Sequence, residues 1–365
     1  MPRATLKLLL GLALAALPSG LLALDPHMDP SFVPEGCNAC HKGHGLARSP
    51  MLPAPQVEVC LSCHGSDSRR AGRSEYGRTS GATTRPQAFS SVLAKPFVHR
   101  IDDRAFSRHE PGRVTCTSCH SPHRGTSSTT RAARPPGTPK RSPRNPSRLE
   151  YELCESCHGR SGRAERHSRS VGERLDPRNR SYHPVKAPSR DGAPSVAAAL
   201  AGREINCTDC HGNNDRGGPR GPHGSSVKFL LVAEYVTVDG SGESDAVYAL
   251  CYTCHDRESV LDSPGFPQHR LHVVDRRISC AACHDAHGSF NNRALIRFGD
   301  EEVLSEVAPS GSTGQLGFAS DSPGSGSCSL TCHGHDHAGT SYGTATPSLP
   351  LREPYRGDRS PLRDR

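Results

Sequence analysis

The stretch CTSCHSPHRG, at residues 116–125, holds two cysteines separated by two residues, a histidine directly after the second, and another histidine three positions later. On a helical turn, Cys116, Cys119 and His120 would project from one face. The CxxCH pattern occurs seven times in the chain, and an eighth stretch, CSLTCH at residues 328–333, has three residues between its cysteines. Together these motifs use each of the 16 cysteines once. The cysteines therefore form one kind of site, repeated along the chain.

All eight motifs have the same three parts. In chain order, the cysteine pairs are Cys37 and Cys40, Cys60 and Cys63, Cys116 and Cys119, Cys154 and Cys157, Cys207 and Cys210, Cys251 and Cys254, Cys280 and Cys283, and Cys328 and Cys332. The histidines that follow them are His41, His64, His120, His158, His211, His255, His284 and His333. CxxCH is the attachment signature of haem c, in which two thiols add to the porphyrin vinyl groups and the histidine binds iron from one side. We therefore expect eight covalently attached haems.

Three other uses of paired cysteines compete with this interpretation. Zinc ribbons need two cysteine pairs for each metal ion, disulfides need no histidine, and a redox dithiol needs one CxxC rather than eight. None of them explains a histidine after every pair.

The composition favours a fold built around these cofactors. Only 33% of the residues are hydrophobic, 5% are aromatic, tryptophan is absent, and the chain contains 36 glycines and 31 prolines. Globular domains usually have an apolar share of about 45–50%. Haem is a flat apolar plate that supplies the missing buried surface. We therefore expect a mostly irregular, haem-cored multihaem cytochrome c with short α-helices.

Histidines outside the motifs are candidates for the second axial ligand of each iron. Of the 21 histidines, eight follow a motif and thirteen do not, whereas the chain has only three methionines. Ligation by two histidines is therefore the expected arrangement at every haem. The distal candidates are His44, His99, His123, His183, His223, His272, His287 and His337, with His27, His109 and His269 as competitors. We expect His167, in an Arg/Ser-rich stretch, to be a surface residue.

The extra histidines reveal an internal repeat. Every second motif, beginning with the first, is followed by one further histidine; in chain order these are His44, His123, His223 and His287. The motifs between them lack this histidine and have an apolar or acidic lead-in, as in VEVCLSCHG and YELCESCHG. Further histidines precede the first motif of each pair. We therefore predict four double-haem units at residues 24–95, 96–182, 183–265 and 266–340, followed by a polar tail at 341–365.

The eighth motif has one residue more than the others. On a helix, cysteines at i and i+4 share a face as those at i and i+3 do. The motif also stands where the repeat requires a second haem. We therefore interpret it as a working variant, with attachment through Cys332 alone as the alternative.

The N-terminus has the pattern of an export signal at residues 1–23. Arg3 and Lys7 precede the apolar run LLLGLALAAL, and Ala23 suits a cleavage site. The run is too short to span a bilayer, and no later segment is apolar enough. We expect an exported protein, periplasmic and possibly associated with the outer membrane or extracellular, without a transmembrane segment in the mature chain.

The charge of the chain points to redox partners. The formal net charge is +8, and residues 125–148 form a basic, Pro-rich linker. Each ferric haem c with two ionised propionates adds about −1, and each ferrous one about −2. An exported protein rarely meets nucleic acid, so we expect the linker to contact haem propionates or an acidic redox partner. Residues 227–238 form the most apolar segment, whose pattern fits either a strand or a helix packed on a haem.

These residues resemble the multihaem cytochromes c with a doubled CxxCH motif, which are related to class III cytochromes. The repeated CxxCHxxHG, the PHGS of Pro222 to Ser225 and the paired LCxxCHG carry the resemblance, which extends from Cys37 to His337. It implies haems packed edge to edge that carry electrons. It also implies redox partners: a periplasmic or inner-membrane donor and an outer-membrane acceptor, including porin–cytochrome conduits.

Three functions remain open from the sequence. An electron carrier or conduit with six-coordinate haems is favoured. A filament subunit would need a ligand shared between subunits or haems exposed at both ends. A multihaem reductase would need an open iron, often marked by lysine in place of the motif histidine, and no motif has lysine there.

Overall fold

The computed structural model describes eleven stretches and three single residues of the chain. They are residues 27, 30, 33–43, 51–65, 89–99, 101, 114–120, 122–123, 150–159, 171–189, 192–198, 200–298, 307–320 and 322–343. The export signal, His44, His109, His167, the basic linker at 125–148 and most of the polar tail lie outside the described residues. The predicted division into four double-haem units stays a prediction.

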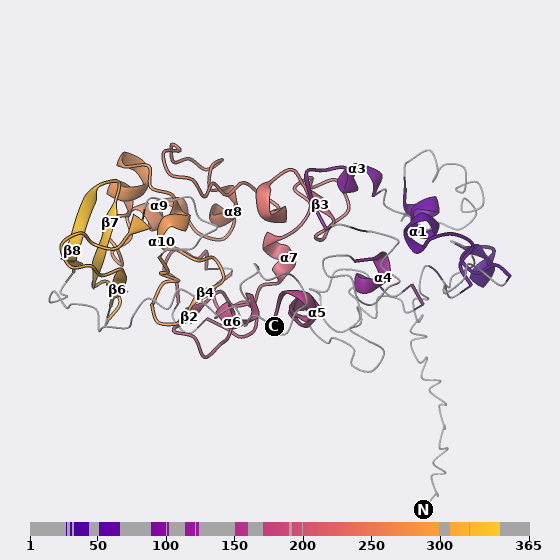
Figure 1. Cartoon of the computed structure of the whole chain (residues 1–365), viewed down its shortest axis with the longest axis horizontal. Coiled ribbons are helices and arrows are strands. Elements are labelled where there is room, and N and C mark those ends of the chain that lie inside the picture. Colours follow the sequence, from indigo (N-terminus) through magenta and orange to yellow (C-terminus); the bar gives the residue numbers. More distant parts are fainter. Residues whose placement is uncertain are drawn as a thin grey trace, which may run out of the picture.

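The molecule is elongated, and the labelled helices that carry cysteine motifs follow one another along its long axis (Figure 1). Helix α1 (Gln56–His64) lies toward one end, and the hairpin of β7 (Gly326–Cys332) and β8 (His335–Tyr342) lies at the other. Helices α5 (Glu150–His158) and α7 (Cys207–Cys210) lie between them. The cysteine motifs are therefore spread along this axis in sequence order.

The helices are short, and many coincide with a cysteine motif. The others are η1 (Gly36–Ala39), α3 (Ser90–Leu93), α4 (Cys116–Cys119), α6 (Val171–Arg174), η5 (Lys228–Leu230), α8 (Ala249–Tyr252), α9 (Arg257–Leu261), η6 (Arg270–Asp275) and α10 (Cys280–Cys283). The expectation of a mostly irregular chain with short helices is confirmed. Within the described part of the chain, no helix has both the length and the apolar character needed to cross a membrane.

Two small antiparallel sheets join segments that are far apart in sequence. Strand β1 (Phe97–Val98) pairs with β3 (Gly224–Ser225), and β2 (Ser181–Tyr182) pairs with β4 (Gly288–Ser289). Each strand has only two residues, so the sheets fix local geometry and do not form a layer.

A larger sheet lies at the C-terminal end. Strands β5 (Val307–Ala308) and β6 (Gly317–Ala319) pair with one edge of β7, and β8 pairs with the other. The eighth motif lies in this sheet, so the expectation that its cysteines share a helical face was wrong: a strand presents them instead. Residues 227–238 form neither a regular strand nor a long helix, because Phe229 and Leu230 have positive φ values of 62° and 59°.

The protein core is small, as the composition predicts. Its fully buried cluster contains Tyr248, Leu261 and Val273. Partly buried side chains around it include Tyr235, Val236 and Cys280. Because Cys280 belongs to a motif, this core adjoins one of the cofactor sites.

Candidate functional site

In the helical motifs, a backbone hydrogen bond between the histidine and the first cysteine closes one turn. The backbone N–H of His120 donates to the carbonyl of Cys116 (2.7 Å). His211 and His284 make the same bond to the first cysteine of their motifs, at 2.8 and 2.9 Å. The turn places two thiols and an imidazole on one side, as covalent attachment of a porphyrin requires.

Seven of the eight motif histidines each face a second histidine from elsewhere in the chain. The pairs, with the motif histidine first and the ring-centroid separation in parentheses, are His41 and His123 (5.7 Å), His64 and His27 (5.9 Å), His120 and His223 (5.8 Å), His158 and His99 (6.1 Å), His211 and His287 (6.2 Å), His255 and His183 (6.4 Å), and His284 and His269 (6.3 Å).

These separations fit a metal ion between the rings. A metal lies about 2.0–2.1 Å from an imidazole nitrogen, so two coaxial ligands have nitrogens about 4 Å apart and ring centroids about 6 Å apart. In the pair of His120 and His223, the Nε2 atoms face each other at 3.5 Å. The residues present therefore fit iron held by two histidines.

Hydrogen bonds at the other ring nitrogen orient several of these imidazoles. Nδ1 of His211 lies 3.0 Å from the Phe229 carbonyl, and Nδ1 of His284 lies 2.7 Å from the Ala294 carbonyl. A carbonyl oxygen only accepts, so Nδ1 carries the proton and Nε2 keeps the lone pair that binds a metal. Similar contacts join His99 to Pro222, His183 to Ala286 and His255 to Ser195.

Burial favours the neutral form of three of the ligand candidates. It lowers the pKa of His223, His255 and His269 to about 4, and a neighbouring histidine adds to the effect in each case. A neutral imidazole is the form that binds a metal.

The cysteines lack the character of reactive dithiols. No cysteine forms a disulfide, and every cysteine lies among the described residues. Burial raises the pKa of Cys119 and Cys251 to about 11, whereas redox-active thiols have lowered pKa values. This agrees with the rejection of disulfides and redox dithiols from the sequence.

The distal candidates fare differently. His99, His123, His183, His223 and His287 each face a motif histidine, and so do the competitors His27 and His269. His272 and His337 face each other instead. The eighth motif histidine, His333, has Nε2 at 3.1 Å from Oδ2 of Asp239.

Comparison with known proteins gives the family. Residues 112–295, half of the chain, match the model for the outer membrane cytochrome MtrC/MtrF-like, domains II/IV. The chain is a multihaem c-type cytochrome of this family. Residues 31–69 match the doubled CXXCH motif model. The motifs therefore indicate covalently bound haem c in a cytochrome of electron transport.

A curated relative supports the same family. The cytochrome is 24% identical over 243 residues to the multiheme cytochrome MtrA of Shewanella baltica (strain OS185), an overlap that covers 62% of this chain and 54% of the relative. The chain thus spans about half the length of the curated relative it matches. No solved structure matches it.

The two small sheets of the cytochrome tie distal ligand candidates together. In the first sheet, His99 directly follows β1 and His223 directly precedes β3. In the second, His183 directly follows β2 and His287 directly precedes β4. Both sheets thus repeat one arrangement, in which an HGS segment pairs with the residues before an upstream histidine. We call His223–Ser225 and His287–Ser289 the HGS segments.

The glycine of each HGS segment allows a close backbone approach. A Cβ at Gly224 would lie 1.9 Å from the Val92 carbonyl oxygen, and one at Gly288 would lie 2.1 Å from that of Arg174. No side chain fits there, so the repeated glycine has a steric cause.

The serine of each HGS segment fixes a loop over a motif histidine. Ser225 Oγ donates to the Leu231 carbonyl at 2.6 Å, and Ser289 Oγ donates to the Ile296 carbonyl at 2.7 Å. Both loops carry the carbonyl, of Phe229 or Ala294, that accepts from the motif histidine. Sequence reasoning missed these supports, although the repeated HGS was visible. The apolar segment at 227–238 contains one of the loops.

A buried carboxylate supports one ligand candidate directly. Asp285 Oδ1 lies 3.4 Å from Nδ1 of His287 and accepts the His287 backbone N–H at 2.9 Å. Its Oδ2 pairs with Arg174 at 3.0 Å and Arg297 at 2.7 Å. Burial alone would raise the pKa of Asp285, but the bond from His287 and the charge of Arg174 outweigh it and lower the pKa. The carboxylate therefore stays ionised beside His287.

Consecutive motifs touch in the first half of the series. Gln56 of the second motif's helix donates to Thr117 Oγ1 of the third at 2.7 Å. Glu150, before the fourth motif, accepts from the Thr208 N–H and hydroxyl of the fifth, both at 2.8 Å. The ligand atoms of Glu150, Cys154 and Cys207 lie within 4.8 Å of one another. Both cysteines are predicted attachment residues, so the cluster fits the predicted haem sites.

The same adjacency continues to the last motif. Burial and the charge of Asp209 are the two largest causes that raise the pKa of Cys210, in the fifth motif, to about 12. Cys254 of the sixth motif adds to this shift. Burial and then Cys251 raise the pKa of Cys280, in the seventh. Burial and then Cys332, in the eighth, raise the pKa of Cys283. Each motif from the fifth to the seventh therefore lies near the motif that follows it.

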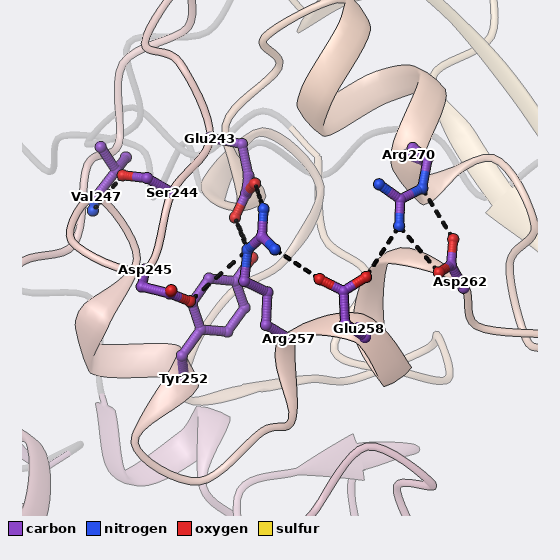
Figure 2. A network of polar contacts seen from close by, with 9 residues as sticks. All are labelled: Glu243, Ser244, Asp245, Val247, Tyr252, Arg257, Glu258, Asp262 and Arg270. Carbon is purple, nitrogen blue, oxygen red and sulfur yellow. Dashed lines mark hydrogen bonds and ion pairs between the residues drawn. The ribbon is translucent and has the colours of Figure 1, made fainter.

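Figure 2 shows an ion-pair network that positions the sixth motif against η6. The Glu243 carboxylate accepts from Tyr252 and from Arg257, each at 2.9 Å. Arg257 also pairs with Glu258, which bonds Arg270 at the start of η6. The network thus holds the segment that carries His269 and His272.

Proposed function

We propose that this cytochrome is an octahaem electron carrier in which electrons travel along haems ordered as the motifs are ordered in the sequence. Haem iron supplies the one-electron chemistry when bound. The observation that carries the proposal is the set of seven facing histidine pairs, strung along an elongated molecule through neighbouring motifs.

The histidine pairs support transfer rather than catalysis at an open iron. The two histidines of each pair would both hold the iron and would leave no position on it for a substrate. Two nitrogen ligands would also hold the reduction potential below that of His/Met ligation. The seven pairs would thus supply fixed haem sites of low potential.

The protein around each pair suits rapid one-electron exchange. The imidazoles of His211 and His284 are held by backbone carbonyls, that of His255 by Ser195 and that of His287 by Asp285, so these ligands need not move when the charge of the iron changes. Contacts between the second and third motifs and between the fourth and fifth, together with the proximity of each motif from the fifth to the eighth to the next, keep these neighbouring sites close.

We place the protein in the cell envelope, as part of a porin–cytochrome conduit or as its periplasmic partner. The support is the MtrC/MtrF-like family match, the MtrA relative and the export pattern at residues 1–23. In this role it receives electrons from a periplasmic or inner-membrane donor and delivers them to an outer-membrane acceptor.

The test is a haem count by intact mass, combined with electron paramagnetic resonance (EPR) and a potentiometric titration of the purified holoprotein. The proposal predicts eight haems, all low-spin in the ferric state and titrating over a broad, low range. A high-spin fraction that binds nitrite or carbon monoxide in the wild type would contradict it and favour a reductase.

A further inference from the structure

The last motif differs from the others in its backbone. Cys328 and Cys332 lie on strand β7, and His333 and Gly334 form the two-residue turn to β8 with φ values of 46° and 75°. Side chains on a strand alternate between faces, so residues four apart share a face and residues three apart do not. The three-residue spacing therefore keeps both thiols on one face, which CxxC on a strand would not.

The face that carries the thiols also carries a histidine from the second strand. His337 is the cross-strand partner of Leu330, which lies midway between the two cysteines, and His335 is the partner of Cys332. Cross-strand partners lie on the same face of a sheet. A porphyrin attached to Cys328 and Cys332 would therefore lie beside His337.

His337 faces a histidine of η6 with the geometry of the seven pairs. The rings of His272 and His337 are 6.2 Å apart between centroids, inside the range of the other pairs. Nδ1 of His272 lies 2.8 Å from the Gln268 carbonyl, which leaves Nε2 with the lone pair. Phe266 lies 5.6 Å from His272 and 4.8 Å from Tyr342, so aromatic groups surround the pair.

The motif's own histidine is bound elsewhere. Nε2 of His333, the nitrogen that faces the partner ring in the pair of His120 and His223, lies 3.1 Å from the Asp239 carboxylate. The other oxygen of Asp239 accepts the Ser279 N–H at 2.7 Å, and its side chain is only 7% exposed. Ser279 precedes the seventh motif, so this contact ties the hairpin turn to the neighbouring haem site.

A comparison of the four predicted units shows that the fourth pairs its upstream histidine differently. In the first three units, the second motif's histidine faces an upstream histidine of the same unit: His64 faces His27, His158 faces His99, and His255 faces His183. In the fourth unit the upstream histidine is His272, but the ring that it faces is His337, not the motif histidine.

We propose that the eighth haem takes His272 and His337 as its axial ligands, and that His333 is a positioning residue which anchors the hairpin turn on Asp239. Each thiol of Cys328 and Cys332 adds across one vinyl group, so that an S–C bond forms and the proton goes to the neighbouring carbon without an oxidant. The inference rests on the proposed octahaem function. His269 and His272 would then bind adjacent irons from one helical segment.

The test uses EPR and intact mass of the full-length holoprotein in four single variants. His272→Ala and His337→Ala should each move one haem of eight from low-spin to high-spin, and added imidazole should restore the low-spin signal. His333→Ala and the control His335→Ala should keep eight low-spin haems.

Two results overturn the inference in distinguishable ways. Eight attached haems with a high-spin signal in His333→Ala and none in His337→Ala would refute the ligand assignment but keep the octahaem function. A wild-type mass with seven haems and an unmodified peptide at Cys328 and Cys332 would refute both. If His333→Ala fails to retain its eighth haem, His337→Ala decides alone: a high-spin signal supports the assignment, and an all-low-spin spectrum overturns it.

Discussion

The rings of His211 and His287 lie 6.2 Å apart and within 2° of parallel, although one belongs to the fifth motif and the other follows the seventh. His41 with His123 and His120 with His223 repeat this relationship. In each case the histidine of the first motif in one predicted double-haem unit faces the histidine that follows the first motif of the next predicted unit. The predicted units thus interlock, because each of these histidine pairs joins two of them.

Double variants test this interlocking. His287→Ala combined with His211→Ala should disturb one haem, because both residues bind the same iron. His287→Ala combined with His284→Ala should disturb two. The measurement is the fraction of haem that becomes high-spin or lost, by EPR and mass. Two disturbed haems in the first double variant and one in the second would mean that His287 binds the same iron as His284 of the seventh motif.

The carboxylate of Asp285, next to His287, should influence the reduction potential of one haem. Asp285→Asn removes a negative charge beside Nδ1 and makes His287 a weaker base, so the oxidised iron loses stabilisation. One of the eight potentials should rise by roughly 60 mV, which is about 1.4 kcal/mol for a one-electron couple. Potentiometry on a protein film measures it.

Asp176→Asn is the control for Asp285→Asn. Asp176 also pairs with an arginine, but that arginine, Arg178, is 88% exposed. All potentials should stay unchanged in this variant. Equal titrations of Asp285→Asn and the wild type would refute the role of Asp285.

The glycine of the second HGS segment should be intolerant of a side chain. Gly288→Ala puts a methyl group against the Arg174 carbonyl and should open the pairing of β2 with β4, which costs about 1–3 kcal/mol. We expect a lower Tm and a high-spin signal from the sites of His183 and His287. Gly242→Ala is the control, because no atom lies within 4 Å of its added Cβ. A wild-type Tm for Gly288→Ala would contradict the steric explanation.

The network in Figure 2 should stabilise the fold in a pH-dependent way. The hydrogen bond from Arg257 lowers the pKa of Glu243 below its ordinary value of 4.5, and burial opposes this shift only in part. A lowered folded-state pKa means that the contribution is complete above the ordinary pKa and is lost as the pH falls through the folded-state value. Glu243→Gln should therefore lower the Tm by roughly 2–4 °C near neutral pH.

The difference between Glu243→Gln and the wild type should shrink as the pH falls below 4.5, because the wild-type carboxylate then takes up its proton. Thermal melts at several pH values measure this. Asp262→Asn is the control in the same network, and its effect should be smaller because the Asp262 side chain is 60% exposed. A constant Tm difference at every pH would contradict the assignment.

The chemistry of each motif could be predicted well from the sequence, because it depends on residues that are close together in the chain. Two thiols and an imidazole on one turn, as at Cys116 to His120, need no distant partner. The pairing of ligands could not be predicted in the same way. His41 faces His123 across a unit boundary, and the sequence carries no signal for which of several spare histidines lies near a given motif.

The hairpin of the eighth motif was predictable in principle. Ser327, Ser329 and Thr331 alternate with Cys328, Leu330 and Cys332, and His333–Gly334 is a two-residue connection. This period of two is typical of a strand. The expectation of a helix for this motif rests on the other seven CxxCH motifs, which suit a helical turn. The supporting residues Ser225, Ser289 and Asp285 were missed because their roles depend on backbone loops that only the fold brings together.

The proposed function requires a series of eight irons between paired histidines, ordered as in the sequence. Anomalous diffraction at the iron edge from crystals of the holoprotein measures the iron positions directly. We expect eight irons along the long axis, seven of them between the motif histidines and their facing partners, and the eighth between His272 and His337. Fewer than eight irons, or irons bound by histidines from other pairs, would contradict it.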